Sequence, residues 1–525
     1  MKTNEMNIAP EKFNLVNENR PLKDKELVTK PIGYFHDAFN RFRKNKGSVV
    51  AAIVIGILVL YALIVPIFSQ YTVSYSDPYY VNVLPKTHIT QNIDFLDGCS
   101  EKTVNEITFI YYYSMKEETG HSDVKNDKYS VKVVETEKRN RPVKVNMYTF
   151  RLDSYQKVGM KFLTGLTEEE YQRIQDYQNE KGRQVIYPIT KFEDRPELPI
   201  NRNDANYWYK TTTNVDGLTA PTDYTFENGV LTLTPVYSLY SGRDNYNSKR
   251  IEGDDVKTYD YARVLADGSY EVRVNYYEYY IYQHTYVLKD RITEPFFFFG
   301  TTSLGKDIFT CLASGARFSF LLAIIVSAVN LVVGAIFGAI EGYYGGKVDL
   351  IMERIVEILS AVPFMIVITL LKYHMETVNH ALLIFIAFFL TGWIGMSGTV
   401  RMQFYRFKNQ EYVLASRTLG ARDIRIMFKH IFPNALGTIV TSCVLVIPSV
   451  IFSETSLSYL GIINLETGSM TSVGTLLAGG QPFLVTFPHM ITYPAIFISL
   501  LMLSFNLFGN GLRDAFNPSL RGTED

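Results

Sequence analysis

Cysteine and net charge are both scarce in this chain of 525 residues. It has three cysteines, Cys99, Cys311 and Cys443. Because Cys443 lies inside an apolar run and Cys311 just before one, we expect neither a disulfide framework nor a cysteine metal cluster. The formal net charge is −1, and a chain without excess positive charge gives no support for nucleic-acid binding.

Apolar residues are distributed unevenly along the chain. The mean hydropathy is +0.00, a value typical of a soluble protein. Residues 49–68 and most of 315–508 are nevertheless strongly apolar, whereas residues 70–299 are polar and contain 28 of the 37 tyrosines. This mixture excludes a disordered chain, a collagen-like chain and a single small domain. It also excludes a membrane protein made only of helices and short loops.

Six apolar runs are long enough to cross a bilayer, whose hydrocarbon core of about 30 Å requires roughly 20 helical residues. They are residues 49–68, about 315–340, about 349–371, about 381–400, about 436–453 and about 489–508. Buried helices of a soluble protein would be shorter and would show a polar face. The sequence therefore predicts an α-helical polytopic membrane protein with six transmembrane helices.

Lysine and arginine near the helix ends predict the orientation, because they accumulate on the cytoplasmic side. Four of them directly precede the first run: Arg41, Arg43, Lys44 and Lys46. Seven more lie within residues 401–429, between the fourth and fifth runs, whereas residues 454–488 contain none. We therefore expect a multi-pass protein of the plasma membrane with both termini in the cytoplasm and residues 70–299 outside the cell.

Residues 1–48 form a cytoplasmic N-terminal segment in this interpretation. Because they precede a run long enough to span, we expect an uncleaved signal anchor and not a cleaved signal peptide. Phe35, Ala38, Phe39 and Phe42 recur at helical spacing. This spacing predicts a short amphipathic helix on the inner membrane surface, with a solvated basic leader as the alternative.

About 230 residues separate the first two runs, which is the size of a full domain. Alternating patterns predict strands at residues 107–114, 129–135, 145–152, 230–236 and 270–288. A helix is predicted over 168–181, where Thr167 and Glu170 form a capping-box pattern. We expect an extracellular α+β, mainly β, domain inserted at residues 70–299. Its tyrosines either form a surface for a partner or ligand, or pack a β core.

Residues 300–307 almost fit a phosphate-binding loop but fail at its last position. The segment reads GTTSLGKD, so Asp307 stands where that loop needs a hydroxyl for magnesium. A carboxylate there would repel phosphates, and no βαβ unit surrounds the segment. The histidines are scattered, without an HExxH spacing. We therefore expect no catalytic residues, and no cofactor or metal held by this chain.

The strongest functional pattern is the basic loop at residues 409–434, NQEYVLASRTLGARDIRIMFKHIFPN. Residues 412–419 are predicted to form a short helix, which Gly420 ends in the left-handed conformation. Asp423 is predicted to cap a second helix, which Pro433 and Asn434 end. Such a helix–turn–helix across the inner face of the membrane indicates a docking knob for a cytoplasmic partner. A solvated connecting loop is the alternative, although the loop is long for a mere connection.

This loop resembles the EAA loop of binding-protein-dependent ABC importer permeases, and more narrowly that of the C-type permease of dipeptide and oligopeptide transporters. The family pattern is close to EYVxAAxxxGA followed by HxxPN. The matching residues here are Glu411, Tyr412, Val413, Ala415, Gly420, Ala421, His430, Pro433 and Asn434. Two positions depart from it: Leu414 stands where many relatives have Glu, and Ser416 replaces Ala. Both are small or apolar enough to keep a packed knob.

Four further stretches are similar to the same family. They are FGTTSLGKDIFTCLASGARFSF at 299–320, EGYYGG at 341–346, SETSLSYLGI at 453–462 and LFGNGLRDAFNPSLRG at 507–522. The resemblance covers 33–68 weakly and 299–522 almost throughout, whereas common members have a much shorter loop in place of 70–299. It implies the architecture of a type I ABC importer permease, with a permease core at 300–525 that includes a coupling loop at 401–435 and a cytoplasmic C-terminal tail.

The resemblance also implies what the chain does and with which partners. It implies a subunit that imports di- or oligopeptides and forms half of the translocation pathway. The implied partners are a second related permease in a heterodimer, two cytoplasmic ATPase subunits that hold ATP and magnesium, and an extracellular peptide-binding lipoprotein. The implied ATPase-coupling residues are Glu411, Tyr412, Leu414, Ala415, Ser416, Gly420, Ala421, His430, Pro433 and Asn434. Import of nickel or another small solute, and a membrane-anchored extracellular receptor or sensor, are the alternatives.

Two residues near the end of the fifth run are candidates for a gate or for the pathway. Pro448 removes a backbone donor from an expected helix, so we expect a kink that either forms a gate or reflects packing alone. Glu454 follows at the outer end, where its carboxylate is either solvated or lines the pathway. At the inner end of the third run, Glu353, Arg354 and Glu357 are expected to form ion pairs.

Overall fold

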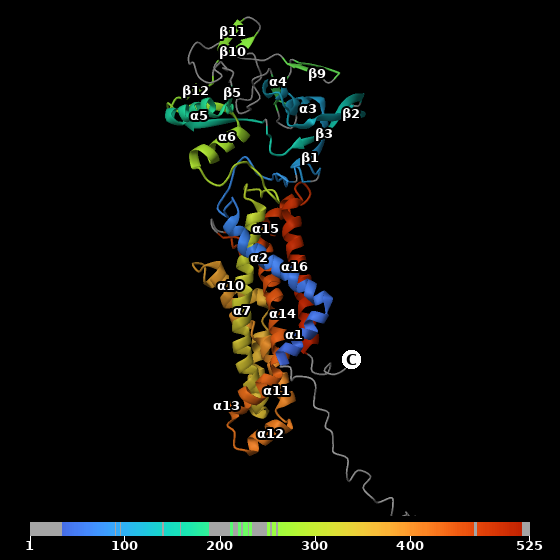
Figure 1. Cartoon of the computed structure of the whole chain (residues 1–525), viewed down its shortest axis with the longest axis vertical. Coiled ribbons are helices and arrows are strands. Elements are labelled where there is room, and N and C mark those ends of the chain that lie inside the picture. Colours follow the sequence, from blue (N-terminus) through green and yellow to red (C-terminus); the bar gives the residue numbers. More distant parts are fainter. Residues whose placement is uncertain are drawn as a thin grey trace, which may run out of the picture.

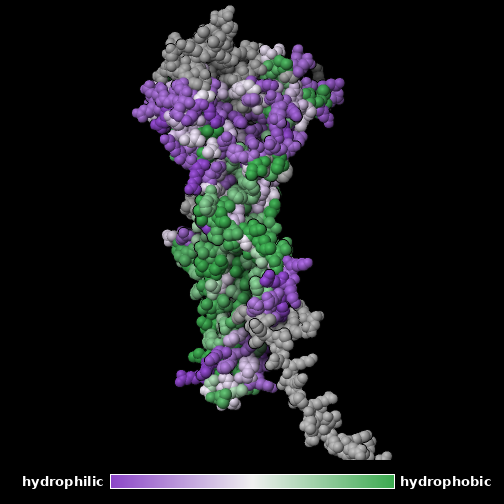
Figure 2. Space-filling model, viewed as in Figure 1, coloured by the Kyte–Doolittle hydropathy of each residue, from purple (hydrophilic) through white to green (hydrophobic). Residues whose placement is uncertain are grey.

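The computed structural model describes residues 34–516, apart from residues 90, 95, 139–140, 158, 188–210, 214–218, 222–223, 229, 234–248, 253–254, 259–260 and 467–469. Figure 1 shows a shaft of long helices that carries a head of strands and short helices at one end. The visible face of the shaft is mainly hydrophobic, whereas the head and the opposite tip are mainly hydrophilic (Figure 2). The uneven hydropathy of the sequence thus corresponds to two parts of the molecule.

Five helical runs of the described residues are long and apolar enough to cross a membrane. They are α2 (Lys46–Phe68), α7 (Ile308–Tyr344), α10 with α11 (His380–Thr391 and Ile394–Phe407), the run Asp423–Tyr459 that includes α14 (Phe432–Tyr459), and α16 (His489–Phe516). The pair α8 (Gly346–Ser360) and α9 (Phe364–His374) passes the same test together, although the two helices are bent by 70°. Counting that pair as one span gives the six that the sequence predicts.

The third predicted span differs from the structure. The sequence predicts one helix over about 349–371, but α8 ends at Ser360 and α9 begins after Pro363. Proline has no N–H to continue a helix and disfavours helical conformation in the residue before it, which accounts for the break. No residue of α8 is buried, so this helix presents a row of exposed apolar side chains along the shaft.

Helix α1 (Tyr34–Lys44) matches the amphipathic helix expected before the first span. Ala38 and Phe42 are buried, whereas Phe39 is exposed. Phe42 packs edge-on against Phe508 of α16, with 5.3 Å between the ring centroids. The buried face of α1 therefore docks on the shaft, and its placement on a membrane surface stays a prediction.

The described part of the head is an α+β arrangement of antiparallel sheets and short helices. Its two larger sheets have the strand orders β1–β3–β2 and β12–β13–β4, with β5 paired to β13, and three hairpins are separate. The strands are β1 (Cys99–Asn105), β2 (Val124–Lys138), β3 (Arg141–Asp153), β4 (Met160–Leu166), β5 (Ile186–Tyr187), β6 (Thr211–Thr213), β7 (Thr219–Pro221), β8 (Tyr224–Glu227), β9 (Val230–Leu233), β10 (Lys249–Glu252), β11 (Asp255–Thr258), β12 (Arg263–Val264) and β13 (Tyr270–Asn275). The helices are α3 (Glu106–Tyr113), α4 (Lys116–Thr119), α5 (Glu168–Lys181) and α6 (Tyr276–Tyr282).

Several predicted elements of the head are confirmed. The strands expected at 129–135 and 145–152 lie within β2 and β3. Helix α5 has the predicted capping box, in which the Thr167 side chain accepts from Glu170 N and the Glu170 side chain accepts from Thr167 N. The strand expected at 230–236 is present as β9 over its first four residues, and its last three lie outside the described residues.

Two predicted strands of the head are wrong in whole or in part. Residues 107–113 belong to helix α3, and the strand expected at 270–288 stops at Asn275, the residue before α6. In both cases an asparagine caps the helix: the Asn105 side chain accepts from Thr108 N, and the Asn275 side chain accepts from Glu278 N. The strand preference of tyrosine and isoleucine yields to these caps and to the burial of one helical face.

The head core is largely aromatic. Tyrosines buried in its main hydrophobic cluster include Tyr113, Tyr148, Tyr171, Tyr177, Tyr261, Tyr270 and Tyr282. Tyr171 stacks on Tyr270 with 5.2 Å between ring centroids, and Phe109 stacks on Tyr148 at 4.6 Å. For these residues the packing alternative holds, since buried rings cannot form a surface for a partner.

The head joins the shaft through a neck of two chain segments, residues 69–98 and 289–307. Thr301 connects them, because its Oγ1 donates to Tyr80 O at 2.7 Å and accepts from Val83 N at 2.8 Å. Lys86 N also donates to Phe297 O at 2.9 Å. The two segments are therefore hydrogen-bonded side by side directly above the shaft.

The sequence that resembles a phosphate loop forms the lower part of this neck. Gly305 has a φ of +70°, and a Cβ at that position would lie 1.9 Å from Asp77 O. Asp307 caps α7, because its Oδ2 accepts from Thr310 N at 2.9 Å and from Thr310 Oγ1 at 2.6 Å. Glycine and aspartate at these positions thus make the close turn that seats the head on α7.

Candidate functional site

The knob, defined as residues 409–434, lies at the end of the shaft opposite the head (Figure 1). Its first helix is α12 (Glu411–Thr418), within which Val413 alone is buried. Tyr412 and Leu414 on either side of it are 40% and 44% exposed, and Leu419 at the end is 88% exposed. Helix α12 thus buries one side chain and leaves most of its other residues exposed.

The turn after α12 confirms the predicted glycine cap. Gly420 has a φ of +78°. Gly420 N donates to Arg417 O at 3.0 Å and Ala421 N donates to Ser416 O at 3.1 Å. This pair of bonds is the Schellman motif, in which a left-handed residue satisfies the last carbonyls of a helix.

The second helix of the knob differs from the prediction. Asp423 does not cap it, because Arg422 is the capping residue and Asp423 belongs to the first turn of α13 (Asp423–Arg425). Pro433 and Asn434 do not end it either, since a π-helical turn, Ile426–Ile431, leads directly into α14. Pro433 stands in the first turn of α14, where a missing N–H is tolerated. The wide π-turn before it makes the transition without a loop.

Three polar side chains that are not among the predicted coupling residues tie the knob to α7. Tyr343, at the end of α7, donates from its hydroxyl to Asp423 Oδ1 at 2.6 Å. Arg417 Nη2 donates to the same hydroxyl at 3.3 Å, and its guanidinium lies 5.6 Å from the centre of the Tyr343 ring. Tyr343 belongs to the EGYYGG stretch, which was noticed only for its family resemblance and gave no indication of this contact.

The structure brings the two halves of the predicted site together. Residues from Glu411 to Ala421 form α12 and its cap, whereas His430, Pro433 and Asn434 belong to the continuous helical run that follows. Asn434 Nδ2 donates to Tyr412 Oη at 3.3 Å and to His430 O at 2.8 Å. Val413 and Ile426 share one buried cluster with residues of α7 and α11. The knob is therefore a packed unit that reaches the ends of three long helices.

Two family models match this chain. A model described as the inner membrane component of binding-protein-dependent transport systems covers residues 330–522. A model described as the N-terminal TM domain of oligopeptide transport permease C covers residues 33–85. The knob lies inside the first match, and residues 86–299 of the neck and head fall between the two.

Curated relatives match about two fifths of the chain. The oligopeptide transport system permease protein OppC of Bacillus subtilis (strain 168) is 44% identical over 223 residues, which are 42% of this chain and 72% of that protein. The chain belongs to the family of inner-membrane permeases of binding-protein-dependent transport systems. The dipeptide transport system permease protein DppC of the same strain is 40% identical to this permease over 42% of this chain and 69% of the relative. Such relatives do not favour a receptor or sensor as the function.

One solved structure is also similar. Its title is "Inward facing conformations of the MetNI methionine ABC transporter: CY5 native crystal form". It aligns with a TM-score of 0.33 and 14% sequence identity, over 39% of this permease and 96% of that chain.

Above the knob, Arg401 of α11 joins α8 to the shaft. Its guanidinium donates to both carboxylate oxygens of Asp349, at 2.7 and 3.1 Å, and lies 3.3 Å from Glu353. Arg354 and Glu357, one turn further along α8, pair with each other. The ion pairs expected at the inner end of the third span are thus present. Because a bidentate arginine contact fixes geometry, Arg401 holds α8 at a defined place on the permease.

The two pathway candidates both lie in α14, and the structure corrects one interpretation. Glu454 is fully buried, and its carboxylate accepts from Ser319 Oγ at 2.7 Å and from Ser458 Oγ at 3.2 Å. The expectation of a solvated carboxylate is therefore wrong, since hydroxyls from α7 and α14 replace water as donors. Pro448 is also buried, and α14 continues through it without a break. A role of either residue in a pathway or gate stays a prediction.

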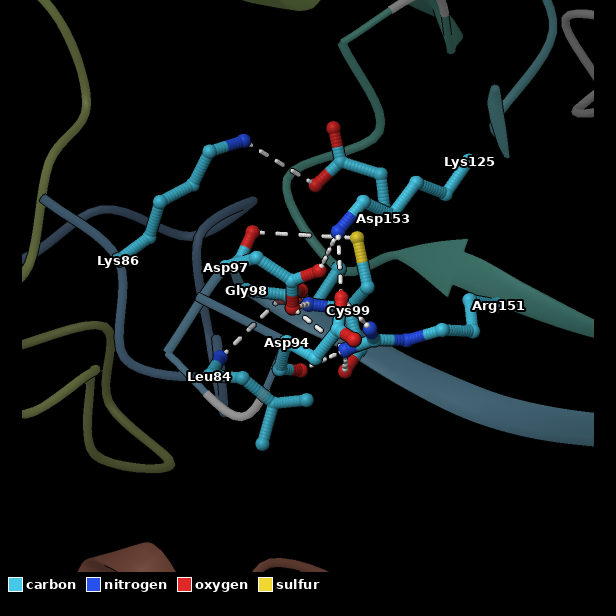
Figure 3. A network of polar contacts seen from close by, with 10 residues as sticks. Leu84, Lys86, Asp94, Asp97, Gly98, Cys99, Lys125, Arg151 and Asp153 are labelled. Atoms are coloured by element: carbon cyan, nitrogen blue, oxygen red, sulfur yellow. Dashed lines mark hydrogen bonds and ion pairs between the residues drawn. The ribbon is translucent and has the colours of Figure 1, made fainter. Parts of the chain in front are cut away.

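A polar cavity of about 560 Å³ lies in the head, beside the segment that leads into β1. Figure 3 shows charged side chains of its lining, together with the neighbouring Arg151, pointing toward one another. Arg151 Nη2 donates to Asp97 Oδ1 at 2.8 Å, Lys125 pairs with Asp97 as well, and Lys86 Nζ lies 3.6 Å from Asp153. The hydrogen bond to Asp97 raises the pKa of Lys125. These charges largely neutralise each other, so the network stiffens the base of the head.

Cys99 lines the same cavity. Burial raises the pKa of its thiol to about 12, so it stays protonated at neutral pH and is a poor nucleophile. Within the described ranges, no group of three His, Cys, Asp or Glu side chains is placed to hold a metal ion. The chemistry that this cavity offers is therefore charge pairing.

Proposed function

We propose that this permease is the membrane-spanning subunit of an ATP-driven importer of di- or oligopeptides. The observation that carries the proposal is the knob: Val413 and the Tyr343 contacts anchor α12, while Tyr412 and Leu414 remain exposed. The relatives that match are named as oligopeptide and dipeptide permeases, which favours peptides over nickel or another small solute as cargo.

In the proposed arrangement the knob and both termini face the cytoplasm and the head lies outside the cell. The basic residues within 401–429 and their absence from 454–488 support this orientation. A second, related permease completes the translocation pathway as a heterodimer. Two ATPase subunits bind beneath the pair and hold ATP and magnesium, and an extracellular lipoprotein delivers the peptide.

The contacts of the knob suggest how movement of an ATPase reaches the membrane helices. Closure of the ATPase pair on ATP displaces α12. The Arg417–Tyr343–Asp423 contact passes this displacement to α7, and the shared packing of Val413 and Ile426 passes it to the run that contains α14. ATP shifts the permease between inward-open and outward-open states only by its differential binding to the two. The permease itself transmits work and hydrolyses nothing.

The head has a separate role in this proposal, because it lies between the two stretches that match the family. We infer that it is a docking platform for the external binding protein, with a brace on the partner permease as the alternative. Its outward position in the proposed orientation and its rigid neck support this role.

The coupling role is tested with a charge on the exposed face of α12. We expect Leu414→Arg to reduce co-purification of the ATPase subunits and peptide uptake by roughly tenfold, since about 1.4 kcal/mol of lost contact has that effect. Val485→Arg is the matched control, because Val485 is 93% exposed in a loop at the other end of the shaft. If Leu414→Arg bound ATPases and transported peptide like Val485→Arg, the coupling assignment would be wrong.

A further inference from the structure

An open apolar groove runs along the shaft between α2 and α7. Its volume is about 600 Å³, and apolar side chains dominate its lining, among them Val59, Leu63, Phe318, Leu321 and Ile324. Neither the proposed coupling nor the head accounts for this groove. One charged side chain also lines the groove.

That side chain is Arg317 of α7, which lines the groove and is exposed. None of the residues lining the groove carries a carboxylate. Among the residues that the structure describes, no hydrogen bond or ion pair to the Arg317 guanidinium is formed. A cation in a membrane helix that has no protein partner requires an anion or water from its surroundings.

Arg317 lies inside the head-side half of the span, about 10 Å along α7 from the level of Thr310. The helix α7 begins at Ile308 on the head side, so Arg317 lies about 13 Å along it. Ser69, which follows α2, hydrogen-bonds to Thr310 at 2.6 Å, so α2 ends at the level where α7 begins. Helical side chains tilt toward the N-terminus, so the Arg317 side chain extends toward the head-side interface.

We propose that this groove binds one anionic phospholipid of the head-side leaflet. The lipid phosphate pairs with the Arg317 guanidinium, and one acyl chain lies along Val59, Leu63, Leu321 and Ile324. A cation at the interfacial end of an apolar groove matches an amphiphile with its charge at one end. A zwitterionic lipid fits less well, because its ammonium has no carboxylate to pair with in the groove.

The first test uses the wild-type permease in complex with its partner subunits. Native mass spectrometry of the complex, purified from mixed phosphatidylglycerol and phosphatidylcholine, is expected to show one retained phosphatidylglycerol per permease. Added phosphatidylglycerol should also raise the thermal midpoint of the complex more than phosphatidylcholine does, because ligands that bind only the folded state stabilise it. Equal retention of both lipids would overturn the proposal.

Variants then locate the site. Arg317→Gln is expected to lower phosphatidylglycerol retention roughly tenfold, since it removes charge-assisted hydrogen bonds, and Arg317→Lys is expected to lower it less. Leu321→Trp, which keeps the arginine but fills the groove, should reduce retention as well. Arg354→Gln, an exposed arginine on α8, is the control with normal retention. Normal retention in Arg317→Gln would overturn the proposal. Crosslinking of Leu321→Cys to the partner permease would show that the partner permease covers the groove instead.

Discussion

The two ends of the shaft differ in how far their residues are buried. At the head end, Thr301 and Asp307 are buried and hydrogen-bonded to backbone atoms or to their own helix, so the neck forms a closed seat. At the knob end, Val413 anchors a helix whose neighbours Tyr412 and Leu414 are exposed. Buried hydrogen bonds in the neck fix the head relative to the shaft, whereas the exposed side chains of α12 are free to contact a partner. This difference is consistent with the proposal that the head is fixed to the shaft and that the ATPases bind the knob.

Glycine shows the same contrast at atomic scale. Gly305 in the neck and Gly420 in the knob have similar backbone conformations, with φ of +70° and +78°. A Cβ at Gly305 would lie 1.9 Å from Asp77 O, whereas a Cβ at Gly420 would meet nothing within 4 Å. One glycine is therefore required by its surroundings as well as by its conformation, and the other by conformation alone.

Removal of the head is expected to have the largest effect on transport and little effect on the shaft. Because Lys86 N donates to Phe297 O, a short Gly–Ser linker can replace residues 88–295 and keep the backbone contacts of Thr301 and Gly305. The deletion also removes Tyr155 and Tyr280, which pack on the neck. We expect peptide uptake and binding-protein capture to fall roughly tenfold or more, as expected if a docking contact of at least 1.4 kcal/mol is lost. Co-purification with the ATPases should stay normal.

The control for this deletion is the same linker inserted after Gly268, a turn of the head with open surroundings. That insertion should leave uptake unchanged. Unchanged uptake and unchanged capture after the deletion would contradict the docking role of the head, and loss of ATPase binding would contradict the independence of the two ends.

Replacement of each glycine by alanine should destabilise the protein more at the neck than at the knob. In Gly305→Ala, left-handed strain and overlap with Asp77 O add, so the seat of the head should lose about 4 kcal/mol. In Gly420→Ala, strain alone should cost about 1 kcal/mol. Limited proteolysis at the neck, together with the thermal midpoint of the purified complex, measures both. Similar protease sensitivity of the two variants would mean that the neck adapts to the added methyl group.

Much of the fold follows from the sequence, and the errors have a common physical source. The apolar runs predict the membrane helices because spanning length is a strict requirement. The strand predicted at 107–114, and the part of 270–288 that follows Asn275, were wrong because tyrosine and isoleucine suit either a strand or one face of a buried helix. Asn105 and Asn275 were the available signals, since asparagine before an apolar run favours a helix cap. Pro363 likewise marked the break in the third span.

The candidate site was predictable in its backbone but not in its contacts. Gly420 was identified because a left-handed cap has a strong residue preference. The bond from Tyr343 to Asp423 joins residues 80 positions apart, and no local pattern indicates such a pairing. The solvated alternative for Glu454 was wrong for the same reason: its hydroxyl donor Ser319 comes from another helix, 135 positions away. Residue spacing along the sequence does not indicate hydrogen-bond partners that tertiary packing brings together from distant helices.

The smallest predicted effect concerns pH at the head end. Burial raises the pKa of Asp307 to about 6, above a value of about 3.9 expected in an unfolded chain. The folded state therefore binds the proton more tightly, and this contribution to stability is complete below pH 4 and is lost as the pH rises through about 6. A difference of about two pKa units corresponds to about 3 kcal/mol at most.

Asp307→Asn keeps the cap on Thr310 without the charge, so its thermal midpoint should change less than that of the wild type between pH 5 and 7.5. Gly420→Ala is the control and should keep the wild-type pH dependence, because nothing lies within 4 Å of a Cβ at Gly420. Identical pH profiles for Asp307→Asn and the wild type would show that the seat of the head is open to water.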